Sequence, residues 1–150
     1  MNKLLMISIT ALVAASPAAA RTHHHRHSSL NWMDGPPGLP SGSKFAVVSG
    51  NPTKAGHFVI QAKFPADYAV PAHSHPTNEM VKVLSGKLHY GMGDKLDMAK
   101  AKTLTAGHSV TMKAKMNHWV HAPAATTIQV SGKGPFQITY VDPKDDPRTK

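Results

Sequence analysis

Apolar and polar residues alternate in short runs over much of the chain beyond residue 57. The runs cover residues 58–64, 81–83, 88–92, 116–121, 128–130 and 136–140. Because alternate side chains point to opposite faces of a β-strand, each run predicts a strand with one buried face. Glycine and proline separate the runs, and only residues 95–102 suggest a helical turn, which is short and polar. The pattern predicts an all-β fold, a sandwich or barrel of antiparallel strands.

The first twenty residues have the character of an export signal. Lys3 precedes a mostly apolar run over residues 4–15, and Ala18 and Ala20 satisfy the small-x-small rule for cleavage. The run is too short for a stable membrane anchor, so we predict cleavage after Ala20 and a periplasmic or secreted mature protein. A membrane anchor or a buried helix is the alternative for this segment. No second apolar run of spanning length follows, and we expect no membrane span in the mature chain.

Residues 21–43 look unlike a packed domain. They begin with a histidine tract, which comprises His23, His24, His25 and His27. The tract would bind metal weakly, act as a solubilising tail, or be an artefact of cloning. Residues 34–43 contain three prolines and three glycines, which favours an extended chain over a helix. We therefore expect a flexible arm over residues 21–43 with Trp32 latching onto the domain, a barrel over 44–142, and a tail over 143–150.

Composition and charge narrow the possible functions. The chain has 150 residues, of which 41% are hydrophobic, and this is enough for one packed core. It has no cysteine, which excludes disulfides, thiolate metal sites and a cysteine nucleophile. The formal net charge is +9, and five lysines lie close together in sequence: Lys95, Lys100, Lys102, Lys113 and Lys115. These lysines form a solvated exterior or attract an anionic substrate or surface. We expect no nucleic-acid partner, because aromatic residues are few and no basic helix is visible.

Four potential metal ligands stand where strand geometry would gather them. His73 and His75 lie two residues apart, so a strand projects both from one face. Glu79 and His118 each share a strand face with apolar neighbours, which predicts that both point inward and need a partner there. These neighbours are Val81 and Val83 for Glu79, and Met116 and Val120 for His118. Three imidazoles and a carboxylate suit one divalent transition metal ion (Fe, Mn, Ni, Zn, Co or Cu) rather than calcium or magnesium. An octahedral ion would keep two positions for water or substrate.

The other histidines of the predicted domain match no ligand position, and we expect them at the surface or in strands. They are His57, His89, His108 and His121. His121 falls on the strand face opposite His118 and is therefore not expected to share its ion. Tyr90 or Met92 could line the pocket. The methionines at positions 92, 98, 112 and 116 are interpreted as filling the core and its rim, with a methionine copper site as the alternative.

The spacing His73-x-His75-x3-Glu79-x6-Gly86 resembles the first sequence motif of the cupin superfamily, although Asp67 stands where the family usually has glycine. The second cupin motif is matched by Gly107 and His118. Three residues depart from that motif: Lys113, Lys115 and Ala122 stand at the usual positions of Pro, Gly and Asn. The resemblance covers about residues 44–141. The C-terminal stretch is also similar to a group of small exported single-domain cupins, through Gly134, Pro135, Tyr140, Val141, Pro143, Asp145, Pro147 and Arg148.

This resemblance implies a small antiparallel, jelly-roll-like cupin barrel in which His73, His75, Glu79 and His118 hold one divalent metal ion. It implies a metal-dependent enzyme with oxidative, decarboxylating or isomerising chemistry on a small molecule, an anion being one option. The alternative function is a non-catalytic module that binds a metal ion or a small ligand. No separate acid–base pair can be identified from the sequence. Because similar cupins often dimerise, a homodimer is a further expectation.

Overall fold

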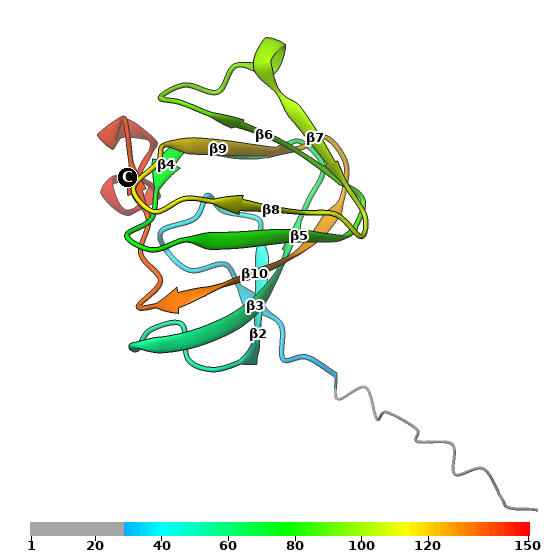
Figure 1. Ribbon diagram of the computed structural model, residues 1–150, viewed down its shortest axis with the longest axis vertical. Coiled ribbons are helices and arrows are strands. Elements are labelled where there is room, and N and C mark those ends of the chain that lie inside the picture. Colours follow the sequence, from blue (N-terminus) through cyan, green and yellow to red (C-terminus); the bar gives the residue numbers. More distant parts are fainter. Residues whose placement is uncertain (1–28) are drawn as a thin grey trace, which may run out of the picture.

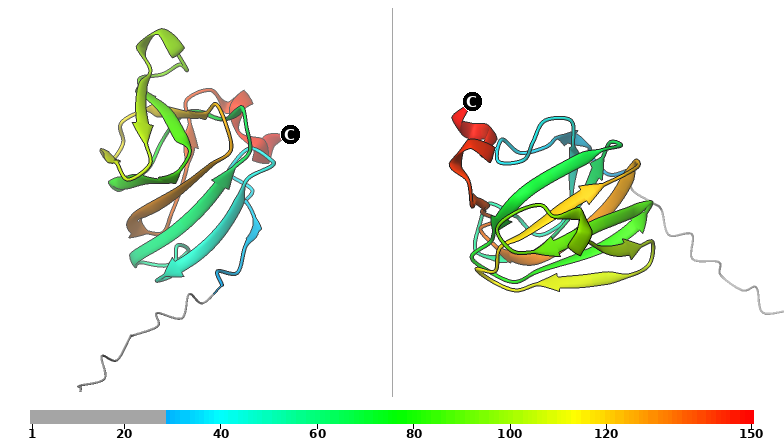
Figure 2. Two further views of the ribbon diagram at one scale, coloured as in Figure 1. Left: turned by 90° about the vertical axis from the view of Figure 1, so that its right-hand side faces the viewer. Right: turned by 90° about the horizontal axis from the view of Figure 1, so that it is seen from above.

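The computed structural model describes residues 29–150, so the predicted signal segment and the histidine tract lie outside the described residues (Figure 1). Within that range, antiparallel strands form two sheets that face each other across a common core (Figures 1 and 2). The first sheet has the order β1 (Met33–Asp34), β2 (Lys44–Ser49), β3 (Gly56–Phe64), β10 (Thr126–Gly134), β5 (Glu79–Ser85) and β8 (Ser109–Met112). The second has the order β11 (Thr139–Tyr140), β4 (Tyr68–Ser74), β9 (His118–Ala122), β6 (Lys87–Met92) and β7 (Lys102–Thr105). The predicted all-β antiparallel barrel is confirmed.

Strands β3, β5, β6, β9 and β10 form where the period-two pattern predicted strands, because their apolar positions face the space between the sheets. The pattern did not predict β1, β2, β4, β7 and β8, which lie outside its runs. Along β3, the side chains of Phe58, Ile60, Ala62 and Phe64 are buried. Along β5, Val81 and Val83 are buried while Met80 between the buried positions is exposed. The described helices are single 3₁₀ turns: Met98–Lys100 in the region predicted to be helical, and Pro143–Asp145 and Pro147–Thr149 near the C-terminus. None of the helices in residues 29–150 is long and apolar enough to cross a membrane.

Strand β9 differs from the predicted half-buried strand, since both of its faces are covered. Trp119 is only 1% exposed although it points away from the face that carries His118. It lies opposite Gly91 in the pairing of β9 with β6, and a Cβ atom at that glycine would overlap the indole ring. Met116, predicted to flank His118 on the inner face, lies outside the strand and is 48% exposed. The run over 136–140 likewise forms a strand only over its last two paired residues, β11.

Residues 33–43 differ from the expected flexible arm. β1 pairs with β2, and the backbone N–H of Gly35 donates to the carbonyl oxygen of Ser43 at 2.9 Å. Residues 35–43, which we call the mouth loop, therefore leave and rejoin the sheet at one place. Prolines and glycines pre-set turns as well as extended chain, and here they fold the loop back so that Leu39 packs against the core. Trp32 does lie on the domain, with the ammonium nitrogen of Lys63 4.0 Å from its ring centroid.

A candidate metal centre

The structure brings all four predicted ligand residues together inside the barrel. His73 lies in β4, His75 directly follows that strand, Glu79 begins β5, and His118 begins β9. All four are buried, with exposures of 4%, 5%, 9% and 1% in that order. His73 is the direct partner of His118 in the β4–β9 pairing, beyond a register shift that follows Val70. Because Glu79 comes from the opposite sheet, the two sheets meet at this cluster.

The donor atoms of the cluster converge on one small volume. The three histidines each offer a ring nitrogen, and these nitrogens lie within 4.8 Å of one another. The Oε2 atom of Glu79 lies 3.3 Å from Nε2 of His75 and 3.6 Å from Nε2 of His118. These separations are longer than a charge-assisted hydrogen bond, which spans about 2.7–2.9 Å. They are close to the separation of two ligands that share a metal ion at about 2.1 Å each.

Backbone carbonyl groups fix which nitrogen of each imidazole faces the centre. Nδ1 of His73 lies 2.7 Å from the carbonyl oxygen of Pro71, and Nδ1 of His118 lies 3.0 Å from that of Met116. Nδ1 of His75 lies 2.6 Å from the carbonyl oxygen of Gln137. A carbonyl oxygen only accepts, so each neutral ring carries its proton on Nδ1 and presents the Nε2 lone pair inward. This is the usual hydrogen-bonding arrangement of metal-binding histidines.

The inward nitrogens are left without protein partners. Nε2 of His75 and Nε2 of His118 are buried and make no hydrogen bond within the described chain. Orphaned buried polar atoms are costly, and lone pairs that face a carboxylate add repulsion. A transition metal ion would satisfy the nitrogens and the carboxylate at once. The three imidazoles and one carboxylate therefore fit the predicted donor set for such an ion.

The electrostatics of the cluster also favour a cation. Burial would raise the pKa of Glu79, but His75 and His118 hold it far below its usual range. Burial would lower the pKa of His75, but the negatively charged carboxylate of Glu79 outweighs it and raises that pKa. Burial, together with the nearby His118 and His75, lowers the pKa of His73 to about 3. In the absence of a metal ion, the buried carboxylate thus draws a proton onto His75, and a bound ion would replace that proton.

A cavity of about 50 Å³ adjoins the cluster. Its walls are apolar and come from both sheets, from the mouth loop and from the segment before β11; they include Leu39, Phe45, Val81, Phe136 and Ile138. Tyr90 and Met92, which sequence reasoning offered as pocket residues, do not line it. Met92, the direct partner of His118 in the pairing of β6 with β9, is instead 45% exposed because it ends the strand, beyond the buried positions of β6.

Sequence reasoning missed the contribution of the mouth loop to this cavity. Pro36 and Leu39 line it although they belong to the segment expected to be a flexible arm. The available signal was one large apolar residue, Leu39, in a stretch otherwise made of glycine, proline and serine. The carbonyl oxygen of Gln137 positions His75. Because every residue type has a backbone carbonyl group, the sequence could not predict this contact.

The remaining histidines of the described chain stay outside the cluster, as expected. His57 and His108 are exposed. His89 and His121 are partners in the β6–β9 pairing, on the sheet face away from the cavity, with ring centroids 5.9 Å apart. The five lysines between residues 95 and 115 are exposed as well. Met112 is buried, whereas Met92, Met98 and Met116 are exposed, so the predicted methionine core is confirmed only in part.

Comparison with known proteins places the barrel among the cupins. The cupin domain family matches residues 62–130. A putative acetylacetone dioxygenase from Methylibium petroleiphilum aligns with a TM-score of 0.62 and 18% identity, over 89% of this chain and 90% of that one. An RmlC-like cupin from Shewanella frigidimarina aligns with a TM-score of 0.57 and 18% identity, over 75% of this chain and 90% of that one. An oxalate oxidase aligns with a TM-score of 0.53 and 19% identity, over 73% of this chain and 60% of that one. None of the curated protein sequences matches the chain significantly. Likeness at these identities establishes the fold.

Proposed function

This chain belongs to the cupin superfamily, and from that premise we propose that it is a metal-dependent enzyme acting on a small molecule. His73, His75, His118 and Glu79 would hold one divalent transition metal ion through three Nε2 atoms and one carboxylate oxygen. The bound ion would supply a Lewis acid or an oxygen-binding centre. The backbone carbonyl groups at residues 71, 116 and 137 hold the Nδ1 atoms of the imidazoles and turn the Nε2 atoms inward.

The make-up of the cavity carries this proposal. Among the residues that line it, only the four candidate ligands have a side-chain nitrogen or oxygen. A molecule in the cavity therefore meets no separate general acid or base, and its activation depends on the ion and its ligands. The apolar walls offer water few polar partners, which would strengthen electrostatic effects near the ion. This favours oxidative, decarboxylating or isomerising chemistry centred on the ion over hydrolysis by a positioned acid–base pair.

We propose a small substrate that presents two oxygen atoms. Two of the similar structures are named as an oxalate oxidase and a putative acetylacetone dioxygenase, and both named substrates carry at least two oxygens on a short carbon frame. Four protein ligands on an octahedral ion leave two positions for such a pair of oxygens. The formal charge of +9, with exposed Lys113 and Lys115 in the loop that precedes His118, favours an anion by electrostatic attraction.

Metal analysis followed by a substrate screen tests the proposal. The protein should carry a variant tract in which His23, His24, His25 and His27 are replaced by serine, so that column metal is not counted. We expect about one ion per chain, and ion-dependent oxygen uptake or carbon dioxide release with a short dicarboxylate or a β-diketone. His118→Ala should abolish that turnover and His121→Ala should keep it. A metal-loaded protein that turns over no member of the panel would contradict the enzyme.

A non-catalytic binding module is the second candidate, and the small size of the cavity favours it. A space of about 50 Å³ holds a few water molecules and leaves little room for a substrate and a co-reactant together. Calorimetry of the metal-loaded protein with the same panel separates the two functions. Binding without turnover supports the module, and turnover supports the enzyme.

We also propose that the protein acts outside the cytoplasm after removal of residues 1–20. The apolar run over 4–15 and the small residues Ala18 and Ala20 support this. N-terminal sequencing of protein recovered from a bacterial periplasm should begin at Arg21. Recovery of the intact N-terminus from the cytoplasm would refute export.

A further inference from the structure

The mouth loop separates the inner cavity from the outside of the barrel. Pro36 and Leu39 line the cavity that adjoins the histidines. The same two residues, with Phe136, also line an outer hollow of about 370 Å³, and Pro36 and Phe136 line a second one of about 420 Å³. The side chains of Pro36, Leu39 and Phe136 therefore form a layer between the inner cavity and the hollows outside it. Any molecule larger than the few waters that the inner cavity accommodates must displace part of this layer.

The loop is built as a flap with its two ends close together. The Gly35–Ser43 hydrogen bond and the β1–β2 pairing hold its base, and the residues between them form a compact loop that contains Leu39 near its middle. Gly42 adopts a φ of +99°, a conformation that glycine tolerates and other residues avoid. A glycine stands next to each end of the loop, so rotation at the base costs little steric strain.

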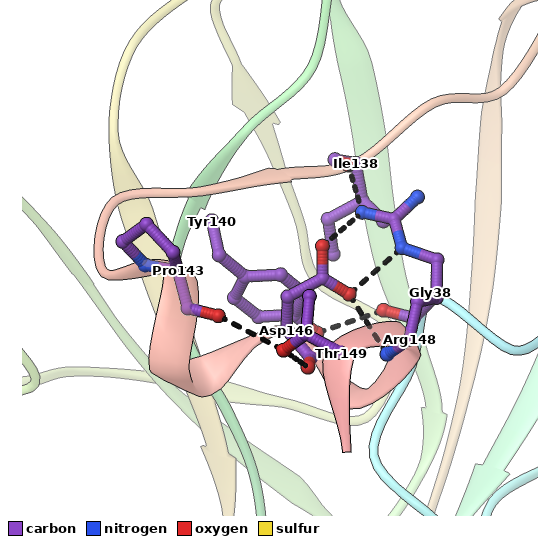
Figure 3. Close-up of polar contacts among 7 residues, drawn as sticks. All are labelled: Gly38, Ile138, Tyr140, Pro143, Asp146, Arg148 and Thr149. Atoms are coloured by element: carbon purple, nitrogen blue, oxygen red, sulfur yellow. Dashed lines mark hydrogen bonds and ion pairs between the residues drawn. The ribbon is translucent and has the colours of Figure 1, made fainter.

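A few hydrogen bonds hold the flap down, and they reach its backbone rather than its side chains. The Tyr68 hydroxyl donates to the carbonyl oxygen of Pro40 at 2.6 Å. The Tyr140 hydroxyl donates to that of Gly38 at 2.8 Å (Figure 3). Leu39 supplies the apolar anchor between these two points. Segments held by so few contacts open at a lower free energy than the strands beneath them.

The C-terminal segment braces one of these hydrogen bonds. Asp146 accepts from Nε and from a terminal nitrogen of Arg148 at 2.7 and 2.6 Å, and that terminal nitrogen also donates to the carbonyl oxygen of Ile138 at 3.0 Å (Figure 3). This contact holds the chain that leads into β11, from which Tyr140 reaches the loop. Gly38 fits closely there: a Cβ atom at that position would lie 2.8 Å from a methyl group of Ile138.

We propose that the mouth loop is the gate of the cavity, and that a small molecule reaches His73, His75, Glu79 and His118 only when the loop swings away and withdraws Leu39. The Tyr68 and Tyr140 hydroxyls hold the closed state, and the loop limits the size of the molecule that the closed barrel can enclose. This inference rests on the proposed function only for the identity of the molecule that enters.

Chemical modification of the buried histidines in metal-free full-length protein tests the gate. Diethyl pyrocarbonate attacks neutral imidazole nitrogens, and residue-resolved mass spectrometry gives the modification rate of His118 relative to exposed His57 in the same molecule. Tyr68→Phe and Tyr140→Phe should each raise this ratio about fivefold, since a neutral hydrogen bond contributes about 1 kcal/mol. Leu39→Ala should raise it further. Tyr90→Phe, which removes a hydroxyl that makes no contact with the loop, should leave it unchanged.

A reversible lock gives the converse result. The chain has no cysteine, so the double variant Gly38→Cys with Ile138→Cys would form one disulfide between the loop and the barrel. Oxidation should suppress modification of His118, and reduction should restore it in the same sample. Gly91→Ala, which loosens the barrel far from the loop, checks that the ratio does not follow global unfolding.

The gate would be overturned if the His118 modification ratio were the same in wild-type protein and in both tyrosine variants. It would also be overturned if His118 were modified at the same rate before and after reduction of the disulfide. A protein that binds no metal but still shows the loop-dependent ratios would refute the proposed function and leave the gate standing. A protein that binds metal and substrate but shows the same modification ratio in all loop variants would refute the gate and leave the proposed function standing.

Discussion

His73 lies directly opposite His118 where β4 pairs with β9, and the centroids of the two imidazole rings are 4.4 Å apart. The pair is distant in sequence and exists only when the two strands are joined. A metal ion held by both residues would bind the folded chain and not the unfolded one. Binding would therefore add to the free energy of unfolding, in proportion to the logarithm of the ion concentration above its dissociation constant.

Replacement of His118 should weaken metal binding, whereas replacement of a histidine on the outer sheet face should not. His118→Ala should lower metal affinity by more than about tenfold, because even the loss of an outer hydrogen-bond partner typically costs 10–100-fold. His121→Ala should leave affinity nearly unchanged, since this residue lies on the other face of β9. Competition with a chromogenic chelator measures both affinities. Equal losses in the two variants would show that the assignment of His118 is wrong.

Glu79 should matter as a ligand and not only as a counter-charge. Glu79→Gln keeps the shape of the side chain but removes the negative charge that faces Nε2 of His75 and of His118. We expect metal affinity to fall by about tenfold or more. Lys82→Gln, on the same strand but facing away from the cavity, is the matched control for loss of a charge. Unchanged affinity in Glu79→Gln would restrict the centre to the three histidines.

Acid should destabilise the metal-free protein through His73. Its pKa is lowered from about 6.5 to about 3 by burial and by the nearby histidines, so between these values the unfolded chain binds a proton that the native protein does not. Stability therefore falls as pH decreases below about 6.5, by at most about 1.4 kcal/mol per pH unit. Urea unfolding of metal-free protein at pH 7.5 and 5.5 measures this loss.

The contribution of His75 to this pH dependence has the opposite sign. Its raised pKa adds stability that is fully present below about pH 6.5 and is lost as pH rises through the raised value. Comparison with His73→Gln isolates the His73 effect, because His75 remains in both proteins. If the two proteins lose the same stability between pH 7.5 and 5.5, His73 is not buried as a neutral imidazole.

The contact between Gly91 and Trp119 should make Gly91→Ala destabilising. A Cβ atom at Gly91 would overlap the buried indole ring, and overpacking of this kind costs about 1–3 kcal/mol. Lys87→Ala, at an exposed position of the same strand, should change stability by less than about 0.5 kcal/mol. Chemical denaturation of both variants provides the comparison. A neutral Gly91→Ala would mean that Trp119 has room to move.

A homodimer stays a prediction, and exposed apolar side chains on the first sheet support it. Met33 and Val48 near its β1–β2 edge, and Met80 and Leu84 on β5, are each between 37% and 46% exposed. Exposed apolar surface of this kind favours association. Sedimentation equilibrium should give twice the chain mass at micromolar concentration. A single-chain mass at the highest attainable concentration would refute the dimer.

The sequence predicted those parts of the molecule whose residue types carry the information. Alternation in β3 and β5 predicted the buried positions correctly, and it also predicted that Glu79 points inward. The spacing of His73 and His75 predicted their common direction. Period-two reasoning failed at Trp119 because a strand covered on both faces has no polar side to reveal it.

The mouth loop escaped prediction for a different reason. Glycine and proline indicate that a segment bends, but not where it docks, and the docking of residues 35–43 depends on two distant tyrosine hydroxyls and on Leu39. Such contacts join residues up to 102 positions apart in the chain. Local patterns contain no record of them.

The carbonyl groups that orient the three imidazoles belong to the main chain, at residues 71, 116 and 137. Of the apolar side chains of the cavity wall, Phe136 stacks on the ring of His75, with centroids 5.0 Å apart, and none makes a hydrogen bond to an imidazole. Mutations at wall positions such as Phe45, Val81 and Ile138 can therefore reshape the space around the centre while the inward-facing nitrogens stay in place. Evolution can therefore change which molecules enter the cavity without changing the residues that would hold the ion. A protein engineer can do the same by substituting wall residues.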